Sequence, residues 1–181
     1  MDRRQDLSAR EVVNEYNEAR LADVLWKYGE ERMSRRIAKT IVLNRSKAAI
    51  ATTGRLEQVV RSVVVGRFAQ KSLSRVFQAI RIEVNNELEN LRRALHETID
   101  LLEVGGRLVV IAYHSLEDRI VKETLNKAAA SRIPSGSKLV ADTEVQPLMR
   151  IQTKKPVLAR EEEVQENSRA RSAKLRAAEK L

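Results

Sequence analysis

Residues 75–88 read R-V-F-Q-A-I-R-I-E-V-N-N-E-L, and residues 105–119 read G-G-R-L-V-V-I-A-Y-H-S-L-E-D-R. From Leu73 to Leu102, apolar residues recur mostly at every third or fourth position, the spacing that places side chains on one face of a helix. This pattern predicts one long helix. The Gly105–Gly106 pair should end it, because glycine adopts the left-handed conformation of a helix C-cap at no steric cost.

The run from Leu108 to Tyr113 is apolar and rich in β-branched residues. It predicts a strand that is buried on both faces, as in the interior of a parallel sheet. A second helix should begin at the carboxyl end of this strand, where open α/β sheets bind their ligands. Ser115 and Asp118 have the spacing of a capping box, so Ser115 is expected to cap that helix. The order of helix, strand and helix favours an α/β domain of nucleotide-binding type.

Residues 1–72 predict a small unit of four helices. Ser8 and Glu11 have capping-box spacing at the start of the first helix, and three more apolar stripes follow at helical intervals. The expected boundaries are Gly29 at the end of the second helix, Glu31 to Arg45 for the third, and Thr53 as the cap of the fourth.

The net charge of +9 is unevenly distributed: residues 1–72 carry +6, residues 73–130 carry −1 and residues 131–181 carry +4. A neutral middle between two basic ends indicates surfaces that meet a polyanion, although Lys and Arg also serve as helix formers on solvated faces. Aromatic residues make up 3% of the chain, which argues against base-stacking platforms. We therefore expect Trp26, the only tryptophan, to pack in the interior rather than to stack on a base.

The chain contains no cysteine, so it has neither disulfides nor a thiolate metal site, and a reducing cytoplasm is the natural compartment. No apolar run approaches the roughly 20 residues that a membrane span requires. The first ten residues also lack the apolar core of a signal peptide. We expect a soluble cytoplasmic protein without a membrane partner.

The carboxyl-terminal third predicts two shorter strands, one around Leu148 to Thr153 and one at Ser172 to Ala177. A loop rich in Pro, Ser and Gly precedes them at Ser131 to Lys138. Between the two strands, Glu161 to Glu163 should form an acidic turn and Asn167 to Arg171 a basic one.

The sequence contains few motifs that indicate catalysis or ligand binding. The two histidines have no carboxylates at a metal-ligand spacing, so no metal site is expected, and no glycine-rich phosphate loop is present. His114–Ser115 is the most suggestive pair because of its place after the strand, although Ser115 could simply cap a helix. Gln78, Arg81 and Asn85 follow i, i+3, i+7 and can line one helix face; the alternative is a solvated face with internal salt bridges.

The two opening motifs, together with E-E-E-V-Q-E-N-S-R-A-R-S-A-K-L-R-A-A-E-K at 161–180 and Y-G-E-E-R-M-S-R-R-I-A-K-T-I-V at 28–42, strongly resemble the bacterial small-subunit rRNA (cytosine-N4)-methyltransferase H family. The resemblance implies an enzyme that uses S-adenosylmethionine to methylate a cytidine in the decoding region of the 30S subunit. It also implies a partial Rossmann-like class I methyltransferase sheet, namely its fifth strand plus the closing hairpin, with an inserted all-helical domain. Residues 1–72 would then recognise the RNA, and residues 73–181 would form the second half of the methyltransferase domain.

The sequence departs from the family pattern mainly by an absence. Members begin with a segment that carries the glycine-rich cofactor loop D-G-T-x-G-x-G-G-H, whereas Met1-Asp2 resembles an internal stretch that follows it. The resemblance therefore assigns no catalytic residue here, implies that the S-adenosylmethionine site is largely missing, and leads us to expect a truncated chain. Locally, Val76 stands where many members have threonine, and Ser168 where many have proline.

Several roles are left as expectations. His114, Ser115, Gln78, Arg81 and Asn85 are candidates for the rim of the active site. The RNA-binding candidates are Arg32, Arg35, Arg36, Lys39, Arg169, Arg171 and Lys174. A non-catalytic RNA-binding or ribosome-assembly protein is the main alternative to a methyltransferase, and a basic helical DNA-binding protein is a third. If the preceding strands are absent, the edge of the Leu108–Tyr113 strand could support a homo-oligomer.

Overall fold

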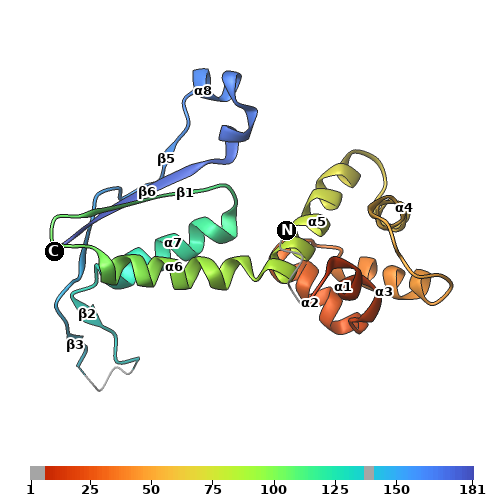
Figure 1. Cartoon of the computed structure of the whole chain (residues 1–181), viewed down its shortest axis with the longest axis horizontal. Helices are drawn as coiled ribbons and strands as arrows, with labels where there is room; N and C mark the ends of the chain where they lie inside the picture. Colours follow the sequence, from red (N-terminus) through yellow and green to blue (C-terminus); the bar gives the residue numbers. More distant parts are fainter. Residues whose placement is uncertain (1–6, 137–140) are drawn as a thin grey trace. The chain divides into compact units, whose positions relative to one another are not determined.

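The computed structural model describes residues 7–136 and 141–181. The chain divides into two compact units, Met1–Glu87 and Leu88–Leu181 (Figure 1). The expectation for Met1-Asp2 and the last part of the loop expected at Ser131–Lys138 lie outside the described residues. Among the residues described, none of the helices combines the length and the apolar character that a membrane crossing requires.

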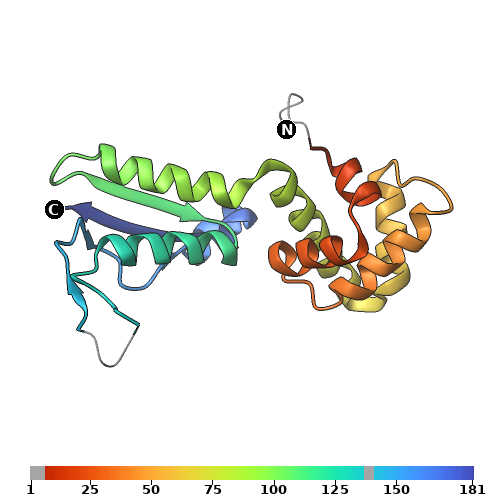
Figure 2. The ribbon, with the colours of Figure 1, turned by 90° about the horizontal axis from the view of Figure 1, so that it is seen from below.

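The first unit is entirely helical, as Figure 2 shows at the red-to-yellow end of the chain. Its apolar core includes Leu25, Ile37 and Val76. The α2 helix packs against both α3 and α5. The elements of this unit are α1 (Ala9–Glu15), α2 (Glu18–Gly29), α3 (Ser34–Arg45), α4 (Thr53–Val63), the short 3-10 helix η1 (Gly66–Phe68) and α5 (Ala69–Asn85).

The N-terminal caps of the helices in this unit are partly as expected. Ser8 caps α1: its hydroxyl accepts a hydrogen bond from the Glu11 amide at 3.3 Å, and the Glu11 carboxylate accepts one from the Ser8 amide at 2.6 Å. The cap of α4 is Thr52, whose hydroxyl accepts from the Arg55 amide at 3.2 Å, so the prediction of Thr53 was wrong by one residue. The α3 helix begins at Ser34, later than expected.

Gly29 ends α2, as expected. It is the last residue of the helix, and Glu30 takes the left-handed conformation instead, with φ of 49°. A Cβ atom at position 29 would lie 2.7 Å from the carbonyl oxygen of Arg75. Glycine is therefore required here because α2 and α5 approach each other closely, and not because the chain turns.

The long helix expected from Leu73 to Leu102 is two helices. Asn86 adopts the left-handed conformation (φ 49°) and separates α5 from α6 (Glu87–Leu101); asparagine tolerates this conformation better than most residues. The α5 helix buries its apolar side in the core of the helical unit. The division between the two compact units falls after Glu87.

The second unit is built on a small sheet, which confirms the α/β class. The β6 strand occupies the middle, with β1 on one side, β4 on the other and β5 also pairing with β6, and every pairing is antiparallel. The elements are β1 (Arg107–Ala112), α7 (Ser115–Ala128), β4 (Met149–Ile151), β5 (Val157–Leu158), α8 (Glu161–Glu166), the 3-10 helix η2 (Ser168–Ser172) and β6 (Lys174–Lys180), with a separate hairpin of β2 (Arg132–Ile133) and β3 (Thr143–Glu144).

The strands expected around Leu148–Thr153 and Ser172–Ala177 are thus present as β4 and β6. In contrast, the acidic turn expected at Glu161–Glu163 is the start of the helix α8. The basic turn at Asn167–Arg171 is largely the 3-10 helix η2.

The β1 strand is covered on one face only, which corrects the expectation of a strand buried on both. The α6 and α7 helices lie along the same face of the sheet (Figure 1). On the other face, the side chains of Val109, Ile111 and Tyr113 are 55%, 51% and 55% exposed. Among the described residues, β1 has β6 as its only partner and is therefore an edge strand.

Candidate functional site

The turn between β1 and α7 is fixed by a capping box, one residue earlier than expected. His114 is the N-cap: its Nδ1 atom accepts from the Glu117 amide at 3.3 Å. The Glu117 carboxylate accepts in return from the amides of Tyr113 at 2.9 Å and His114 at 3.3 Å. Ser115 is the first residue of the helix and is exposed. The cap is His114 rather than Ser115 because His114 is the last residue with extended backbone before the helix.

The Glu117 carboxylate is held ionised by this arrangement. Its partial burial would raise its pKa, but the His114 ring and the two amides outweigh that effect and keep the pKa below its usual range. The Nε2 atom of His114 is buried and lies 3.3 Å from a Glu117 oxygen without forming a hydrogen bond. The His114 ring thus acts on Glu117 by its proximity, and the two backbone amides provide the hydrogen bonds of the turn.

Asp118, the residue expected to complete a box with Ser115, instead connects α7 to the sheet. Its carboxylate accepts from Arg176 Nε at 2.6 Å and from Lys174 Nζ at 3.1 Å. Both Asp118 and Arg176 are buried. The hydrogen bond from Arg176 is the main reason why the pKa of Asp118 is lowered, and Lys174 adds to it. Lys174, a candidate for RNA contact, therefore already has a carboxylate partner.

The three candidates on α5 have partners within the helical unit. Arg81 and Asn85 converge on Glu87, with the Arg81 Nε atom 2.9 Å and the Asn85 amide nitrogen 2.8 Å from Glu87 Oε1. Gln78 donates to the backbone carbonyl of Tyr28 at 3.2 Å. These side chains thus hold the end of α5 and the end of α2, whereas His114 and Ser115 belong to the other unit.

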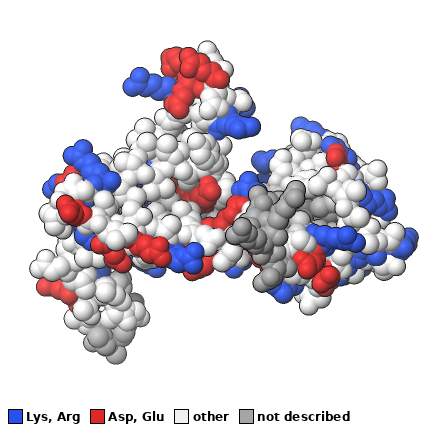
Figure 3. Space-filling view, in the orientation of Figure 1, with Lys and Arg blue, Asp and Glu red and all other residues white. Residues whose placement is uncertain are grey.

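The basic candidates of the helical unit lie on and just before α3. Arg32, Arg35, Arg36 and Lys39 are all exposed, and basic side chains are spread over this unit on the face shown in Figure 3. In the carboxyl-terminal candidates, Arg169 and Arg171 of η2 are exposed on either side of the buried Ala170.

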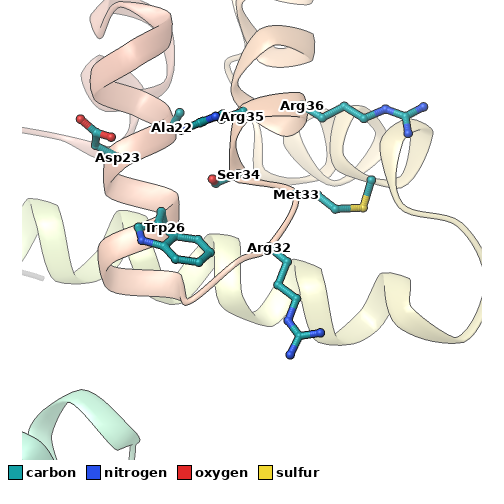
Figure 4. Close-up of a pocket in the computed structure, with 8 residues that line it drawn as sticks. All are labelled: Ala22, Asp23, Trp26, Arg32, Met33, Ser34, Arg35 and Arg36. Carbon is teal, nitrogen blue, oxygen red and sulfur yellow. The ribbon is translucent and has the colours of Figure 1, made fainter.

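A pocket of about 530 Å³ lies between α2 and the start of α3. Figure 4 shows Ala22, Asp23 and Trp26 on the α2 side, with Arg32, Met33, Ser34, Arg35 and Arg36 opposite. Trp26 is 60% exposed, so the prediction that it packs in the interior was wrong. The stripe of α2 buries Leu21, Val24 and Leu25, and position 26 lies off that stripe, which is the signal in the sequence that could have revealed it.

A model of the MraW methylase family matches residues 1–181. The chain belongs to this family. Among the proteins similar to this MraW family chain, one from Chloroherpeton thalassium is named ribosomal RNA small subunit methyltransferase H. It is 49% identical over 180 residues, which cover 97% of this chain and 56% of that protein.

Two further relatives carry the same name. The protein of Kocuria rhizophila is 46% identical over 184 residues, covering 100% of this chain and 56% of the relative. The protein of Lactobacillus delbrueckii subsp. bulgaricus is 45% identical over 188 residues, which cover 100% of this chain and 58% of the relative. This MraW family chain therefore spans somewhat more than half the length of the curated relatives that it matches.

Two glycines stand where the chain approaches its own atoms closely. Of the six glycines, only Gly29 and Gly106 have atoms within 4 Å of an added Cβ, and both lie against the chain's own atoms rather than a ligand space. Within the described part of this MraW family chain, no group of three His, Cys, Asp or Glu side chains is arranged to hold a metal ion.

Proposed function

We propose that this chain supplies the RNA-facing helices and one edge of the sheet of a methyltransferase that modifies small-subunit rRNA. The observation that carries the proposal is the family match over residues 1–181, together with the name shared by the relatives. The acceptor is the N4 amine of a cytidine and the donor is S-adenosylmethionine, which supplies an electrophilic methyl group. The loop D-G-T-x-G-x-G-G-H does not occur in residues 1–181, and in this proposal the donor site belongs to the whole protein.

The architecture supports this assignment. In the proposal, β1 is the fifth strand of a class I methyltransferase sheet, and β6 with β4 forms the closing hairpin. An antiparallel β6 beside β1 and a helix that follows β1 are consistent with that order. The exposed face of Val109 and Ile111 is then the surface that helices of the other half would cover.

The chemistry defines what this chain must contribute. The exocyclic amine of cytosine is a weak nucleophile because its lone pair is delocalised into the ring. Catalysis therefore depends on alignment of the amine with the methyl group, and on acceptors for the N–H charge that develops. The His114–Ser115 turn lies at the carboxyl end of β1, and we assign it to the rim of the active site.

Reconstitution tests the function. Residues 1–181 combined with the remaining part of a full-length relative, S-adenosylmethionine and unmodified 30S subunits should yield N4-methylcytidine in the small-subunit rRNA, detected by mass spectrometry of nucleosides. RNA binding without any methyl transfer would favour the alternative, a non-catalytic RNA-binding or assembly protein. Methylation of another base would reject the cytidine assignment.

The chain alone should not bind S-adenosylmethionine at micromolar concentration. No glycine-rich loop is found in residues 1–181, and such a loop is what allows the backbone to approach a nucleotide-type cofactor closely. Isothermal titration calorimetry of residues 1–181 should show no heat of binding. Saturable binding at one site per chain would contradict both this prediction and the assignment of the donor site to another part of the protein.

Replacing Arg32, Arg36 and Lys39 together with alanine should reduce the salt dependence of RNA binding. Each lost phosphate contact lowers the slope of log K against log salt by about 0.7 for a single strand, because fewer counterions are released. Fluorescence anisotropy with labelled RNA at several salt concentrations measures this slope. Arg10→Ala, which removes an exposed charge on α1, serves as the control; an unchanged slope in the triple variant would remove these residues from the RNA surface.

A further inference from the structure

Trp26 occupies an unusual position for the largest side chain of the protein. It lies on α2, a helix whose other large apolar residues are buried, yet 60% of its surface is exposed. Leu43, Val65 and Phe68 of the same unit are exposed as well, but the Trp26 ring is the largest of these apolar surfaces, and burying it would be strongly favourable. The helical unit therefore keeps an indole face open to solvent.

The surroundings of this indole form a concave site. The pocket of about 530 Å³ is within the size range of small-ligand sites. Figure 4 shows the ring extending from α2 toward the segment that leads into α3, while Arg35 reaches across toward Ala22. Ser34, at the start of α3, is buried and forms part of the wall.

The positive charge at this pocket is available to a ligand. Among the described residues, Arg32 and Arg35 form no ion pair and no side-chain hydrogen bond, and both are exposed. Other arginines of the unit are engaged: Arg61 pairs with Glu57 at 2.7 Å, and Arg81 pairs with Glu87 at 2.9 Å. Among the described residues, Arg32 and Arg35 are therefore free to contact an anion.

We propose that this pocket binds one unstacked nucleotide of a single-stranded RNA segment. The base stacks on the Trp26 indole, and the flanking phosphates contact Arg32 and Arg35. Arg36 also lines the pocket but extends away from α2 in Figure 4 and takes no part; Arg32 extends away from the Trp26 ring, so it can reach a flanking phosphate but not the base. This inference rests on the proposed function only in naming the polyanion as rRNA.

The chemistry of the pocket selects this occupant over other polyanions. An aromatic face adds binding energy only if a π-face is presented to it, and single-stranded RNA offers unstacked bases for this purpose. Duplex RNA keeps its bases stacked, and an acidic peptide has none. Asp23, exposed beside the pocket, repels phosphate from the α2 side and can accept a hydrogen bond from an exocyclic amine of the base.

The fluorescence of the protein provides a direct test, because Trp26 is the only tryptophan. Residues 1–181 are titrated with single-stranded octacytidylate, with an abasic ribose-phosphate oligomer of equal charge, and with polyglutamate. Octacytidylate should quench the Trp26 emission, and the other two should not. Binding of octacytidylate without quenching, equal quenching by polyglutamate, or no binding of octacytidylate would each overturn the subsite.

Variants separate stacking from charge. Trp26→Ala should weaken octacytidylate binding between about 5-fold and 100-fold, the range for loss of one base–aromatic stack, and should leave the salt slope unchanged. Trp26→Phe should recover most of the affinity. Arg32→Gln and Arg35→Gln should each lower the slope by about 0.7. Phe68→Ala, which removes another exposed aromatic of the same unit, is the matched control and should bind normally.

The two proposals fail differently. If reconstituted protein transfers no methyl group but octacytidylate still quenches Trp26, the methyltransferase function is rejected and the nucleotide subsite stands. If methyl transfer is normal and the Trp26→Ala variant binds and methylates RNA as the unmodified chain does, the subsite is rejected and the function stands.

Discussion

Replacing Asp118 with alanine should lower the free energy of unfolding by about 3–5 kcal/mol, the range for breaking a buried ion pair by removal of one partner. The reason is that the substitution leaves the Arg176 guanidinium buried without a partner. Arg176 is buried in β6, and its Nε atom has the Asp118 carboxylate as its partner at 2.6 Å. Without that carboxylate, a buried guanidinium has no counter-charge. Urea denaturation of residues 1–181 followed by circular dichroism measures the loss, and hydrogen exchange should locate it in β1 and β6.

Two further variants show whether charge burial is the cause. Asp100→Asn removes an exposed carboxylate from α6 of the same unit and should change stability by less than about 0.5 kcal/mol. The double change Asp118→Leu with Arg176→Met should recover much of the loss, because it removes both buried charges together. If Asp118→Ala were as mild as Asp100→Asn, the link between α7 and β6 would not depend on this pair.

The same pair gives stability a pH dependence of known sign. Arg176, and then Lys174, lower the pKa of Asp118 in the folded protein, so the unfolded chain takes up the proton more readily. The contribution of the pair is therefore complete above the ordinary value of 3.8 and is lost as the pH falls through the lower folded value. The difference in stability between the unmodified chain and Asp118→Asn should accordingly shrink below about pH 4.

A large change in molecular mass should follow from two substitutions on the open face of β1. Val109 and Ile111 are about half exposed, and β1 has a free edge among the described strands. Apart from Arg107 at its start, β1 carries no charge and no proline, and such an edge is a template for pairing with another chain. We expect residues 1–181 to associate beyond the monomer mass of 20.6 kDa, and Val109→Lys with Ile111→Lys to restore the monomer.

Light scattering across a dilution series measures the association. Leu43→Lys changes an equally exposed apolar residue of the helical unit and should leave the mass unchanged. A monomer at every concentration of the unmodified chain would show that the β1 face does not pair. Addition of the other part of a full-length relative should also suppress association, because it would occupy the same face.

Local signals in the sequence were sufficient for most elements. The apolar periodicity that predicted the helices of the first unit is a property of neighbouring residues, and the buried stripe of α4 is the one expected. The helix caps were harder to predict. Thr52 and Thr53 carry the same hydroxyl group, and the backbone conformation decides which of them caps α4. The break at Asn86 was missed because one left-handed residue hardly disturbs an apolar repeat.

The remaining misses concern contacts between distant residues. Arg176 lies in a strand that reads as half polar, and its burial depends on Asp118, 58 positions earlier. The open face of β1 depends on which strands and helices surround it, so an apolar run alone could not distinguish one covered face from two. Trp26 is a different case, because its position off the apolar stripe of α2 already indicated exposure and the prediction did not use that signal.

The central place of β6 also determines when each unit can fold. The helical unit closes its core with residues up to Glu87, and its helices pack both in consecutive pairs and between α2 and α5. The sheet unit depends on β6, which pairs with β1 across 72 positions between Arg107 and Glu179. Contacts of such separation slow folding, because a long loop must be ordered before they form. During synthesis the helical unit can therefore fold first. The apolar residues of β1 stay exposed until β6 has been synthesised.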